Sequence, residues 1–429
     1  MYVLILIYNL FIRFYFTIAK IGAATGNKKA QEWIAGRRHL FQELKNNIQP
    51  SEHYIWIHCA SAGELEQGKP VIEALKKTYP NHKILISFFS PSGYKAGKKY
   101  AVADLISYLP LDTKQNAKHF IETVQPKLVV FVKYEYWYHH LKTVRQNNIP
   151  LVLISAIFRK EQVFFKWYGL FYRNILHLFS YIFLQDESSY QLLKTLGVEH
   201  CSIAGDTRFD RVIAITTHPQ LIAYIDTFTS DQPVLIAGST WPDDEQMIAE
   251  AVSAFTNLHL IIAPHEITAS HITHLQHLFP DALLYSKLSE ISKHPENTAI
   301  TPSGNKPAVL IIDNVGMLSR LYQYATIAYI GGGFNKSGIH NTLEAAVWGK
   351  PVLFGPNYQK FKEARDLIAM EGASSVQTAG SLKQIIHLLL NDTTELQERS
   401  AAARNYVHQN KGATEKIVHY IQENRLLTS

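Results

Sequence analysis

The sequence predicts an α/β protein with two doubly wound domains, each built on a parallel sheet that is covered by helices on both faces. Three observations lead to this prediction. At 429 residues the chain is too long for one ordinary domain. Short apolar runs alternate with helical stretches, which is the pattern of βαβ units. The apolar runs are continuous rather than alternating in polarity, as expected for strands buried on both faces.

The composition limits the classes of partner. Hydrophobic residues make up 47% and charged residues 18%, which is typical of a folded chain with an ample core. The net charge of +6 suits an anionic membrane surface or anionic substrates as well as nucleic acid. No Lys/Arg-rich run with interleaved aromatic residues is present, so we expect no nucleic-acid partner. Cys59 and Cys201 have neither metal-ligand spacing nor a disulfide framework, which favours a reducing cytosol.

The first 21 residues are predicted to form a membrane anchor. They are almost wholly apolar, but a transmembrane helix needs about 20 such residues, so the segment is barely long enough. Arg13 near its middle makes a spanning position costly. Basic residues follow the segment, and the positive-inside rule then keeps the rest of the chain in the cytoplasm. The anchor either spans the bilayer or lies in its interface; the alternative is a buried N-terminal helix.

The N-terminal domain is expected at residues 22–215 and the C-terminal domain at 216–429, with the polar stretch 216–232 between the two series of strands. The last helix can pack back on the N-terminal domain. Predicted strands cover 54–59, 84–88, 105–109, 128–132, 151–154 and 181–184 in the first domain, and 234–237, 258–263, 309–312, 327–330 and 352–354 in the second. Facing domains of this kind bind ligands at the carboxyl ends of their strands, so site residues are expected just after strands.

Small residues and a carboxylate follow the first predicted strand. Ser61 and Gly63 let a ligand approach the backbone, and the start of the helix expected from about Glu66 attracts anions. Glu64 has the chemistry of a general base for an attacking hydroxyl. The alternative is that Glu64 only favours the start of the helix through its dipole.

Two further polar groups stand near strand ends. Glu135 lies among aromatic residues after the strand at 128–132, a setting typical of functional acids; the alternative is a structural pair with Lys133 or Arg159. Arg208 carries a cation that would offset charge on a departing phosphate. A local Arg–Asp pair in a surface turn is the alternative for Arg208.

The most specific pattern is the run Gly331, Gly332 and Gly333, which follows a predicted strand. Glycines free the backbone to wrap phosphate, and we expect the N-terminus of the following helix to point at it. The spacing is neither a dinucleotide fingerprint nor a Walker loop. Glu344, one turn into that helix, is placed to bind ribose hydroxyls.

Two other features are open to more than one interpretation. His271, His274 and His277 could share part of a helix face, but no H-E-x-x-H pattern is present and we predict no metal site. The aromatic residues of segment 163–184 have largely helical spacing, which indicates either a core-facing helix or an exposed aromatic face resting on a bilayer.

Taken together, these stretches resemble the Kdo transferases (3-deoxy-D-manno-octulosonic acid transferases) of lipopolysaccharide assembly. The similarity covers nearly the whole chain after the anchor, and the order of its many short stretches makes it specific. They are residues 61–64, 90–93, 108–112, 135–137, 205–210, 237–240, 331–333 and 340–344.

The resemblance implies a GT-B fold and metal-independent, inverting transfer of Kdo from CMP-Kdo to a lipid A precursor (lipid IVA) at the cytoplasmic face of the inner membrane. It needs no cofactor, and the oligomeric state stays open. By analogy Glu64 is the general base, Glu135 and Arg208 stabilise the transition state, and Ser61 and Gly63 meet acceptor or sugar. The resemblance assigns nucleotide binding to a larger set: Pro264, His265, Val315, Gly316, Met317, Asn341, Thr342, Leu343 and Glu344.

The chain departs from the family pattern at several of these positions. The family usually has Lys where Arg208 stands, and its Pro-Arg appears here as Pro264-His265, so a titratable group replaces a permanent cation. The family's Met-Gly-Glu reads Val315-Gly316-Met317. Two alternatives remain: another GT-B enzyme with a UDP-sugar and a lipid-linked acceptor, and a non-catalytic GT-B scaffold.

Overall fold

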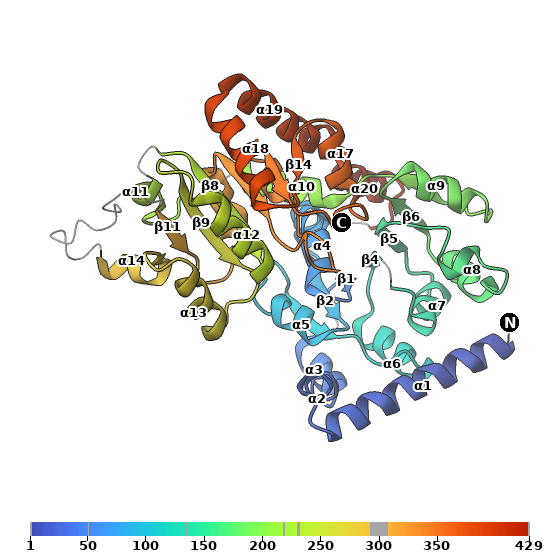
Figure 1. Ribbon diagram of the computed structural model, residues 1–429. Helices are drawn as coiled ribbons and strands as arrows, with labels where there is room; N and C mark the ends of the chain where they lie inside the picture. The colour runs from blue at the N-terminus through green and yellow to red at the C-terminus, as the bar shows by residue number, and fades with distance from the viewer. Residues whose placement is uncertain are drawn as a thin grey trace. The chain divides into compact units, whose positions relative to one another are not determined.

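The computed structural model describes residues 2–49, 51–133, 135–217, 219–229, 232–291 and 308–427. The chain forms two compact units (Figure 1). The N-terminal unit comprises Met1–Arg211 with Lys411–Ser429, and the C-terminal unit comprises Val212–Asn410. Each unit holds one seven-stranded sheet, and all recorded strand pairings are parallel. The predicted architecture of two parallel-sheet α/β domains is confirmed.

The N-terminal sheet has the strand order β3-β2-β1-β4-β5-β6-β7. Chain order reverses between β1 and β4, so the loops after these two strands lie on either side of a topological switch point, where open α/β sheets bind ligands. The strands are β1 (Tyr54–Cys59), β2 (Lys83–Phe88), β3 (Leu105–Tyr108), β4 (Leu128–Val132), β5 (Leu151–Ala156), β6 (Tyr181–Leu184) and β7 (Cys201–Ile203).

Helices cover both faces of this sheet, and a separate hydrophobic core lies on each face. The C-terminal helix α20 belongs to this unit: Ile417 and Ile421 are fully buried in one core. The carboxylate of Asp210 accepts hydrogen bonds from the N–H groups of Gly412 and Thr414, each 2.7 Å long, at the start of α20. The helices are α1 (Tyr2–Ala24), α2 (Lys28–Ala35), α3 (Leu40–Asn47), α4 (Ala62–Thr78), α5 (Pro91–Gly97), α6 (Lys114–Val124), α7 (Tyr138–Gln146), α8 (Leu170–Leu176), α9 (Glu187–Lys194), α10 (Thr207–Thr217) and α20 (Ala413–Glu423), with a 3-10 turn η1 (Val163–Phe165).

The C-terminal sheet has the order β10-β11-β9-β8-β12-β13-β14, with its switch point between β8 and β12. Its strands are β8 (Val234–Thr240), β9 (His259–Pro264), β10 (Leu283–Leu284), β11 (Val309–Ile311), β12 (Ile327–Ile330), β13 (Val352–Phe354) and β14 (Ala373–Ser375). The helices are α11 (Ile225–Thr229), α12 (Pro242–Val252), α13 (Ala269–Leu278), α14 (Tyr285–Ile291), α15 (Leu318–Leu321), α16 (Leu343–Ala346), α17 (Lys362–Ala369), α18 (Ala379–Asn391) and α19 (Thr393–Gln409), with a 3-10 turn η2 (Tyr322–Tyr324).

Every predicted strand is present, and within the described residues three others are not predicted by the pattern. These are β7, β10 and β14, which all lie at sheet edges and have only two or three residues. Such short runs carry no recognisable hydrophobic pattern.

The aromatic segment 163–184 is not one helix. It breaks into η1, α8 and β6, and its side chains divide between core and solvent. Phe164 and Phe171 are buried, whereas Trp167 and Tyr168, in the turn between η1 and α8, are exposed. Phe164 and Phe171 therefore fit the core-facing interpretation, and contact with a bilayer stays a prediction for Trp167 and Tyr168.

Candidate active site

Glu64 lies in the turn between β1 and α4, where it forms half of a capping box with Ser61. The Oγ of Ser61 accepts a hydrogen bond from the N–H of Glu64 at 3.5 Å. In return, Oε2 of Glu64 accepts from the N–H groups of Ala60 and Ser61, the second at 3.2 Å. This reciprocal cap starts the helix at Ala62, earlier than the expected start near Glu66. Glu64 thus supports the helix start, and both hydrogen bonds to its carboxylate are accepted by Oε2.

The electrostatic setting of Glu64 is unusual for a capping residue. Burial disfavours the charged carboxylate, and the neighbouring charge of Glu135 disfavours it further. The N–H groups of the cap and Lys133 act in the opposite direction. Together they raise the pKa of Glu64 to about 7. A carboxyl group with this pKa can both accept and release a proton near neutral pH, as a general base requires.

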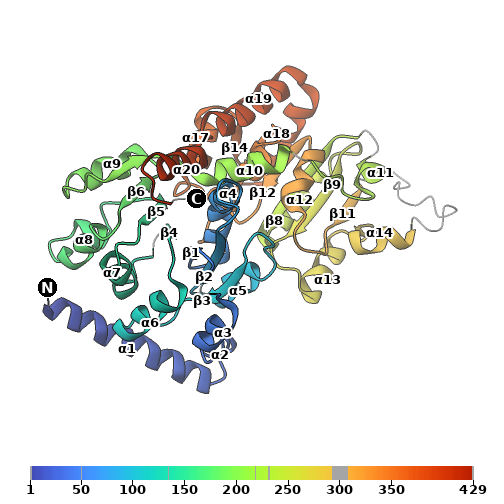
Figure 2. The same ribbon diagram turned by 180° about the vertical axis from the view of Figure 1, so that it is seen from behind.

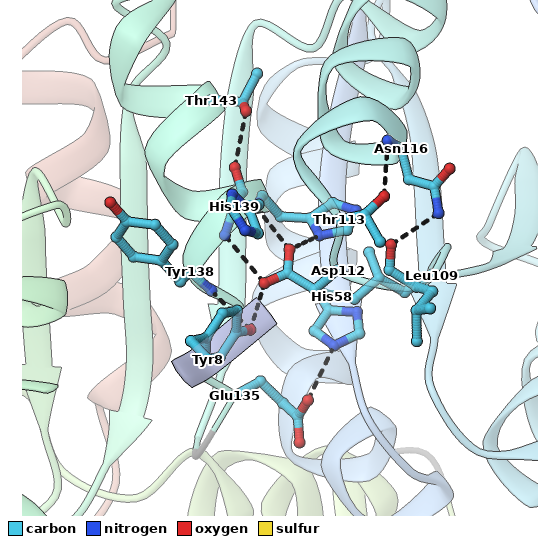
Figure 3. Close-up of polar contacts among 12 residues, drawn as sticks. Tyr8, His58, Leu109, Asp112, Thr113, Asn116, Glu135, Tyr138, His139 and Thr143 are labelled. Carbon is cyan, nitrogen blue, oxygen red and sulfur yellow. Dashed lines mark hydrogen bonds and ion pairs between the residues drawn. The ribbon is translucent and has the colours of Figure 1, made fainter. Parts of the chain in front are cut away.

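Glu135 follows β4 on the other side of the switch point, and His58 of β1 reaches it (Figure 3). Nε2 of His58 lies 3.5 Å from Oε2 of Glu135, and the His58 side chain is fully buried. On its other side, Nδ1 of His58 lies 2.9 Å from Oγ of Ser87, which accepts a hydrogen bond from Nε1 of Trp56 at 2.7 Å. Burial lowers the pKa of His58, so the ring is neutral and the Ser87 hydroxyl donates to Nδ1. Nε2 of His58 then carries the proton on the side of Glu135, without hydrogen-bond geometry to its carboxylate.

Sequence reasoning did not identify His58 or Ser87. Both lie inside strands as isolated polar residues among buried apolar ones. A polar side chain on a strand that is covered on both faces needs a partner, and this is the signal that would have indicated them.

Gly63 and Gly93 have different surroundings. A Cβ at Gly63 would meet only the Ser61 hydroxyl, at 3.9 Å, so the position is open. A Cβ at Gly93, at the start of α5, would lie 3.1 Å from the backbone of Ser61 and 2.6 Å from the Phe88 ring. Because Gly93 has no side chain, the start of α5 can pack directly against the backbone of Ser61.

Arg208 lies in the first turn of α10 and is engaged by Asp206. Its Nε and Nη2 atoms lie 2.8 and 2.7 Å from Oδ2 of Asp206, and its N–H donates to Oδ1 at 2.9 Å. The hydroxyl of Thr207 donates to the carbonyl of Gln67 at 2.6 Å, which ties this turn to α4, the helix that carries Glu64. The local Arg–Asp pair is thus present, and a role of Arg208 in transition-state stabilisation stays a prediction.

In the C-terminal unit, the three glycines after β12 permit close contacts between backbones. A Cβ at Gly331 would lie 2.2 Å from the carbonyl oxygen of Ser239, and one at Gly333 would lie 2.5 Å from the backbone of Gly355. Gly332 has a φ of +89°, which other residues rarely adopt. The N–H groups of Gly331 and Gly332 donate to Gly238 and Asp244 within the protein. These two glycines therefore shape the loop rather than offer donors to a phosphate.

Asp244 of α12, which no sequence pattern singled out, fastens this glycine loop. Its Oδ2 accepts from the N–H groups of Gly332 at 2.8 Å and Trp241 at 3.0 Å, and its Oδ1 accepts from the hydroxyl of Tyr329 at 2.8 Å. The residue is completely buried, and burial raises its pKa. Asp244 thereby connects the loops after β8 and β12 at the switch point of the second sheet.

A stack of three rings lies beside the glycine loop. The ring of His265, directly after β9, is parallel to those of Trp241 and His340, with centroids 4.8 and 4.3 Å apart. Nε1 of Trp241 donates to Nε2 of His340 at 3.2 Å. Burial and the neighbouring His265 lower the pKa of His340 to about 4, so this ring is neutral at pH 7. The flat faces of this stack suit a planar ligand.

The remaining predicted nucleotide residues lie in the same unit: Pro264 ends β9, Leu343 and Glu344 begin α16, and the others lie on loops. The Asn341 amide donates to Glu344 Oε1 at 3.1 Å, and its Oδ1 accepts from the N–H of Leu343. Thr342 and Leu343 are completely buried, Val315 is exposed, and Gly316 with Met317 precedes α15. The helix expected to follow the glycines is present but short: α16 begins at Leu343 and has four residues, so Glu344 lies in its first turn. A helix this short gives little dipole support to a phosphate.

The histidines of α13 show no metal-like grouping. His271 Nε2 lies 3.0 Å from both carboxylate oxygens of the buried Glu245, which also accepts from the Thr240 hydroxyl at 2.8 Å. Within the described ranges, no three His, Cys, Asp or Glu side chains are grouped to hold a metal ion.

Comparison with known proteins shows which proteins the chain resembles. Residues 34–211 match the family model described as 3-deoxy-D-manno-octulosonic-acid transferase (kdotransferase). The chain is 28% identical over 385 residues to the 3-deoxy-D-manno-octulosonic acid transferase of Haemophilus influenzae, covering 86% of both chains. It is 25% identical over 334 residues to the enzyme of that name from Aquifex aeolicus, covering 77% of this chain and 83% of the relative.

Solved structures agree in fold. The UDP-GlcNAc 2-epimerase of Neisseria meningitidis bound to UDP-GlcNAc has a TM-score of 0.59 at 16% identity, covering 86% of this chain and all of the other. MurG of Acinetobacter baumannii has a TM-score of 0.53 at 14% identity, covering 87% and 99%. These neighbours confirm the GT-B fold. By sequence, residues 34–211 resemble the Kdo transferases, and the similarity to named Kdo transferases extends over most of the chain.

Proposed function

We propose that the protein transfers Kdo from CMP-Kdo to a lipid A precursor at the cytoplasmic face of the inner membrane, with inversion and without a metal ion. The observation that carries this proposal is Glu64, a carboxyl group whose pKa is about 7, at the switch point of a Kdo-transferase domain. A base of this strength suits proton removal from a sugar hydroxyl at neutral pH.

The proposed reaction uses Glu64, Glu135 and Arg208. Glu64 accepts the proton of the acceptor hydroxyl as its oxygen forms a bond to the anomeric carbon of Kdo. The bond between that carbon and the phosphate oxygen breaks, and CMP leaves with the electron pair. Attack from the face opposite to the leaving phosphate inverts the anomeric configuration. Glu135, in the loop after β4, and Arg208, in the first turn of α10, would stabilise the charge that develops.

The C-terminal unit would hold the donor. Asn341 and Glu344 offer polar atoms for the nucleotide, and the ring of His265 offers a flat face. The internal hydrogen bonds of Gly331 and Gly332 fix the loop in advance. Because α16 is short, we assign phosphate binding to side chains and to loop N–H groups other than those of Gly331 and Gly332, rather than to a helix dipole.

Replacement of Glu135 by Gln is expected to shift the pH dependence of kcat/KM. The charge of Glu135 helps to raise the pKa of Glu64, so its removal lowers that pKa. Glu64 acts as a base only when deprotonated, so the acidic limb of the profile moves to lower pH, whatever the change in maximal rate. An unchanged midpoint would show that Glu135 does not act on the base.

The proposed function is tested by transfer from CMP-Kdo to a tetra-acylated lipid A precursor in the presence of a chelator. UDP-sugars serve as the alternative donors. Melting temperatures measured with CMP and with UDP supply an independent readout, because a ligand stabilises the protein that binds it. A larger increase with UDP would favour the alternative GT-B enzyme.

A further inference from the structure

Helix α1 has one face that is bound to the N-terminal unit. The hydroxyl of Tyr8 donates to the buried carboxylate of Asp112 and accepts from the N–H of Tyr138 at 3.3 Å (Figure 3). Next to Tyr8, Oδ1 of Asn9 lies 2.6 Å from Nε2 of His139. Ile12, one turn after Tyr8, is buried. These contacts hold the middle of the helix along the domain.

Aromatic contacts continue this attachment toward the C-terminal half of α1. The ring of Tyr15 lies 5.8 Å from Trp33 and 5.9 Å from Phe89, and Phe16 lies 6.3 Å from Trp33. The guanidinium of Arg37 packs over the Trp33 ring at 3.9 Å. The helix is thus attached over more than two turns, and it lies flat against the unit in both views (Figures 1 and 2).

The opposite face of α1 is apolar and exposed. Its side chains recur at helical spacing, so they form one stripe along the helix. Arg13 and Lys20, seven residues apart, lie along one flank of this stripe and are exposed. The members are Val3 (65% exposed), Leu6 (50%), Ile7 (58%), Leu10 (69%), Phe11 (59%), Phe14 (61%), Ile18 (51%) and Ile21 (59%).

A second exposed apolar group lies next to α1. Trp167 (90% exposed) and Tyr168 (57%) lie in the turn before α8, and Leu170 (51%) is the first residue of that helix. Helix α8 packs against α1, because the rings of Phe171 and Tyr8 lie 5.4 Å apart. Trp and Tyr are the residues that concentrate at the boundary between lipid headgroups and acyl chains.

We propose that α1 lies in the plane of the membrane, with its apolar stripe and the 167–170 turn inserted into one leaflet, and does not cross the bilayer. This proposal rests on the membrane location given under Proposed function. A helix that crossed the bilayer would lose the contacts of Tyr8 and Asn9 with Asp112 and His139. Tyr8, Asn9 and Arg13 would then lie in hydrocarbon. An in-plane position keeps every hydrogen bond and buries only the apolar stripe.

The two basic residues of α1 indicate that the helix prefers anionic lipids. Arg13 and Lys20 on the flank of the stripe meet lipid phosphates when the stripe is inserted. We therefore expect several-fold tighter binding to vesicles that contain phosphatidylglycerol than to vesicles of phosphatidylcholine alone.

Depth measurements on the full chain test this position. Val3→Cys, Leu10→Cys and Ile21→Cys each place a spin label on the stripe, while the native Cys59 and Cys201 are buried. In vesicles of phosphatidylethanolamine and phosphatidylglycerol, an in-plane helix puts the three labels at equal, shallow depth. A spanning helix would put Leu10 deepest and separate the other two by about 27 Å along the bilayer normal, which would overturn the proposal. Labels that contact a second copy of the chain instead of lipid would overturn it as well.

Binding measurements test the 167–170 turn. Trp167→Ser is expected to weaken vesicle binding about ten-fold, because a large aromatic surface no longer inserts. Leu221→Ser is the matched control, since Leu221 is 79% exposed in the C-terminal unit, and its binding should stay unchanged. Equal binding of both variants would exclude the turn from the membrane surface.

The two proposals fail separately. Transfer to a short-chain acceptor dispersed in detergent measures the reaction without a bilayer. Active protein with a depth gradient would contradict only the in-plane position, whereas inactive protein with three shallow labels would contradict only the proposed function.

Discussion

Glu64→Gln is expected to lower kcat by about 10²–10⁴-fold, the usual contribution of a general base. The carboxylate of Glu64 lies in the turn after β1, and its pKa of about 7 allows proton removal at neutral pH. Gln has the same shape but cannot take the proton. Its amide oxygen still accepts the N–H groups of Ala60 and Ser61, because Gln also completes a capping box. The measurement is the rate of Kdo transfer at saturating CMP-Kdo.

Two comparisons separate chemistry from folding in this experiment. The melting temperature of Glu64→Gln should match that of the unchanged protein, since the cap is retained. Glu66→Gln, on the same helix but with a half-exposed side chain paired to Lys69 and Arg211, should keep nearly full activity. If Glu64→Gln retained turnover, Glu64 would not be the general base and would serve only as a helix cap.

Asp244→Ala is expected to remove CMP binding and to destabilise the C-terminal unit. The carboxylate satisfies two buried groups of β12 and its loop, the hydroxyl of Tyr329 and the N–H of Gly332. Each buried donor that loses its acceptor costs about 1–3 kcal/mol of folding free energy. The freed glycine loop would also lose its fixed shape beside the ring stack. The measurement is the melting temperature with and without CMP.

Asp244→Asn is the matched control for this variant. Its amide oxygen can accept from Gly332 and Trp241, and its NH₂ group can donate to the oxygen of Tyr329. We expect most of the stability and CMP response to return. A CMP-induced increase in melting temperature that is the same in Asp244→Ala as in the unchanged protein would show that the loop does not take part in nucleotide binding.

Much of the fold could be predicted from the sequence, because long parallel strands that are buried on both faces appear as continuous apolar runs. The runs at β1, β4, β6, β12 and β13 agree with the structure to the residue. The positions of the candidate site residues could be predicted from the same apolar runs, since ligands bind at the carboxyl ends of such strands. Glu64 and Glu135 lie after β1 and β4, the two strands at the switch point.

Other features depend on contacts between segments that are distant in sequence. Asp244 looks like an ordinary acidic residue at the start of a helix, and only the fold brings it to Gly332. His58 and Ser87 are paired by the register of β1 and β2. The apolar spacing of α1 was visible, but its attachment through Tyr8 to Asp112 was not, because that contact joins residues 104 positions apart.

The most direct test of the central claim is a mass measurement on purified protein with preformed CMP-Kdo, a tetra-acylated lipid A precursor and a chelator. CMP-Kdo is prepared beforehand, because the synthetase that makes it needs its own metal. The account predicts that the acceptor gains the mass of one or more Kdo units and that CMP is released in equal number. Folded protein that binds CMP but adds no Kdo to this acceptor would contradict it.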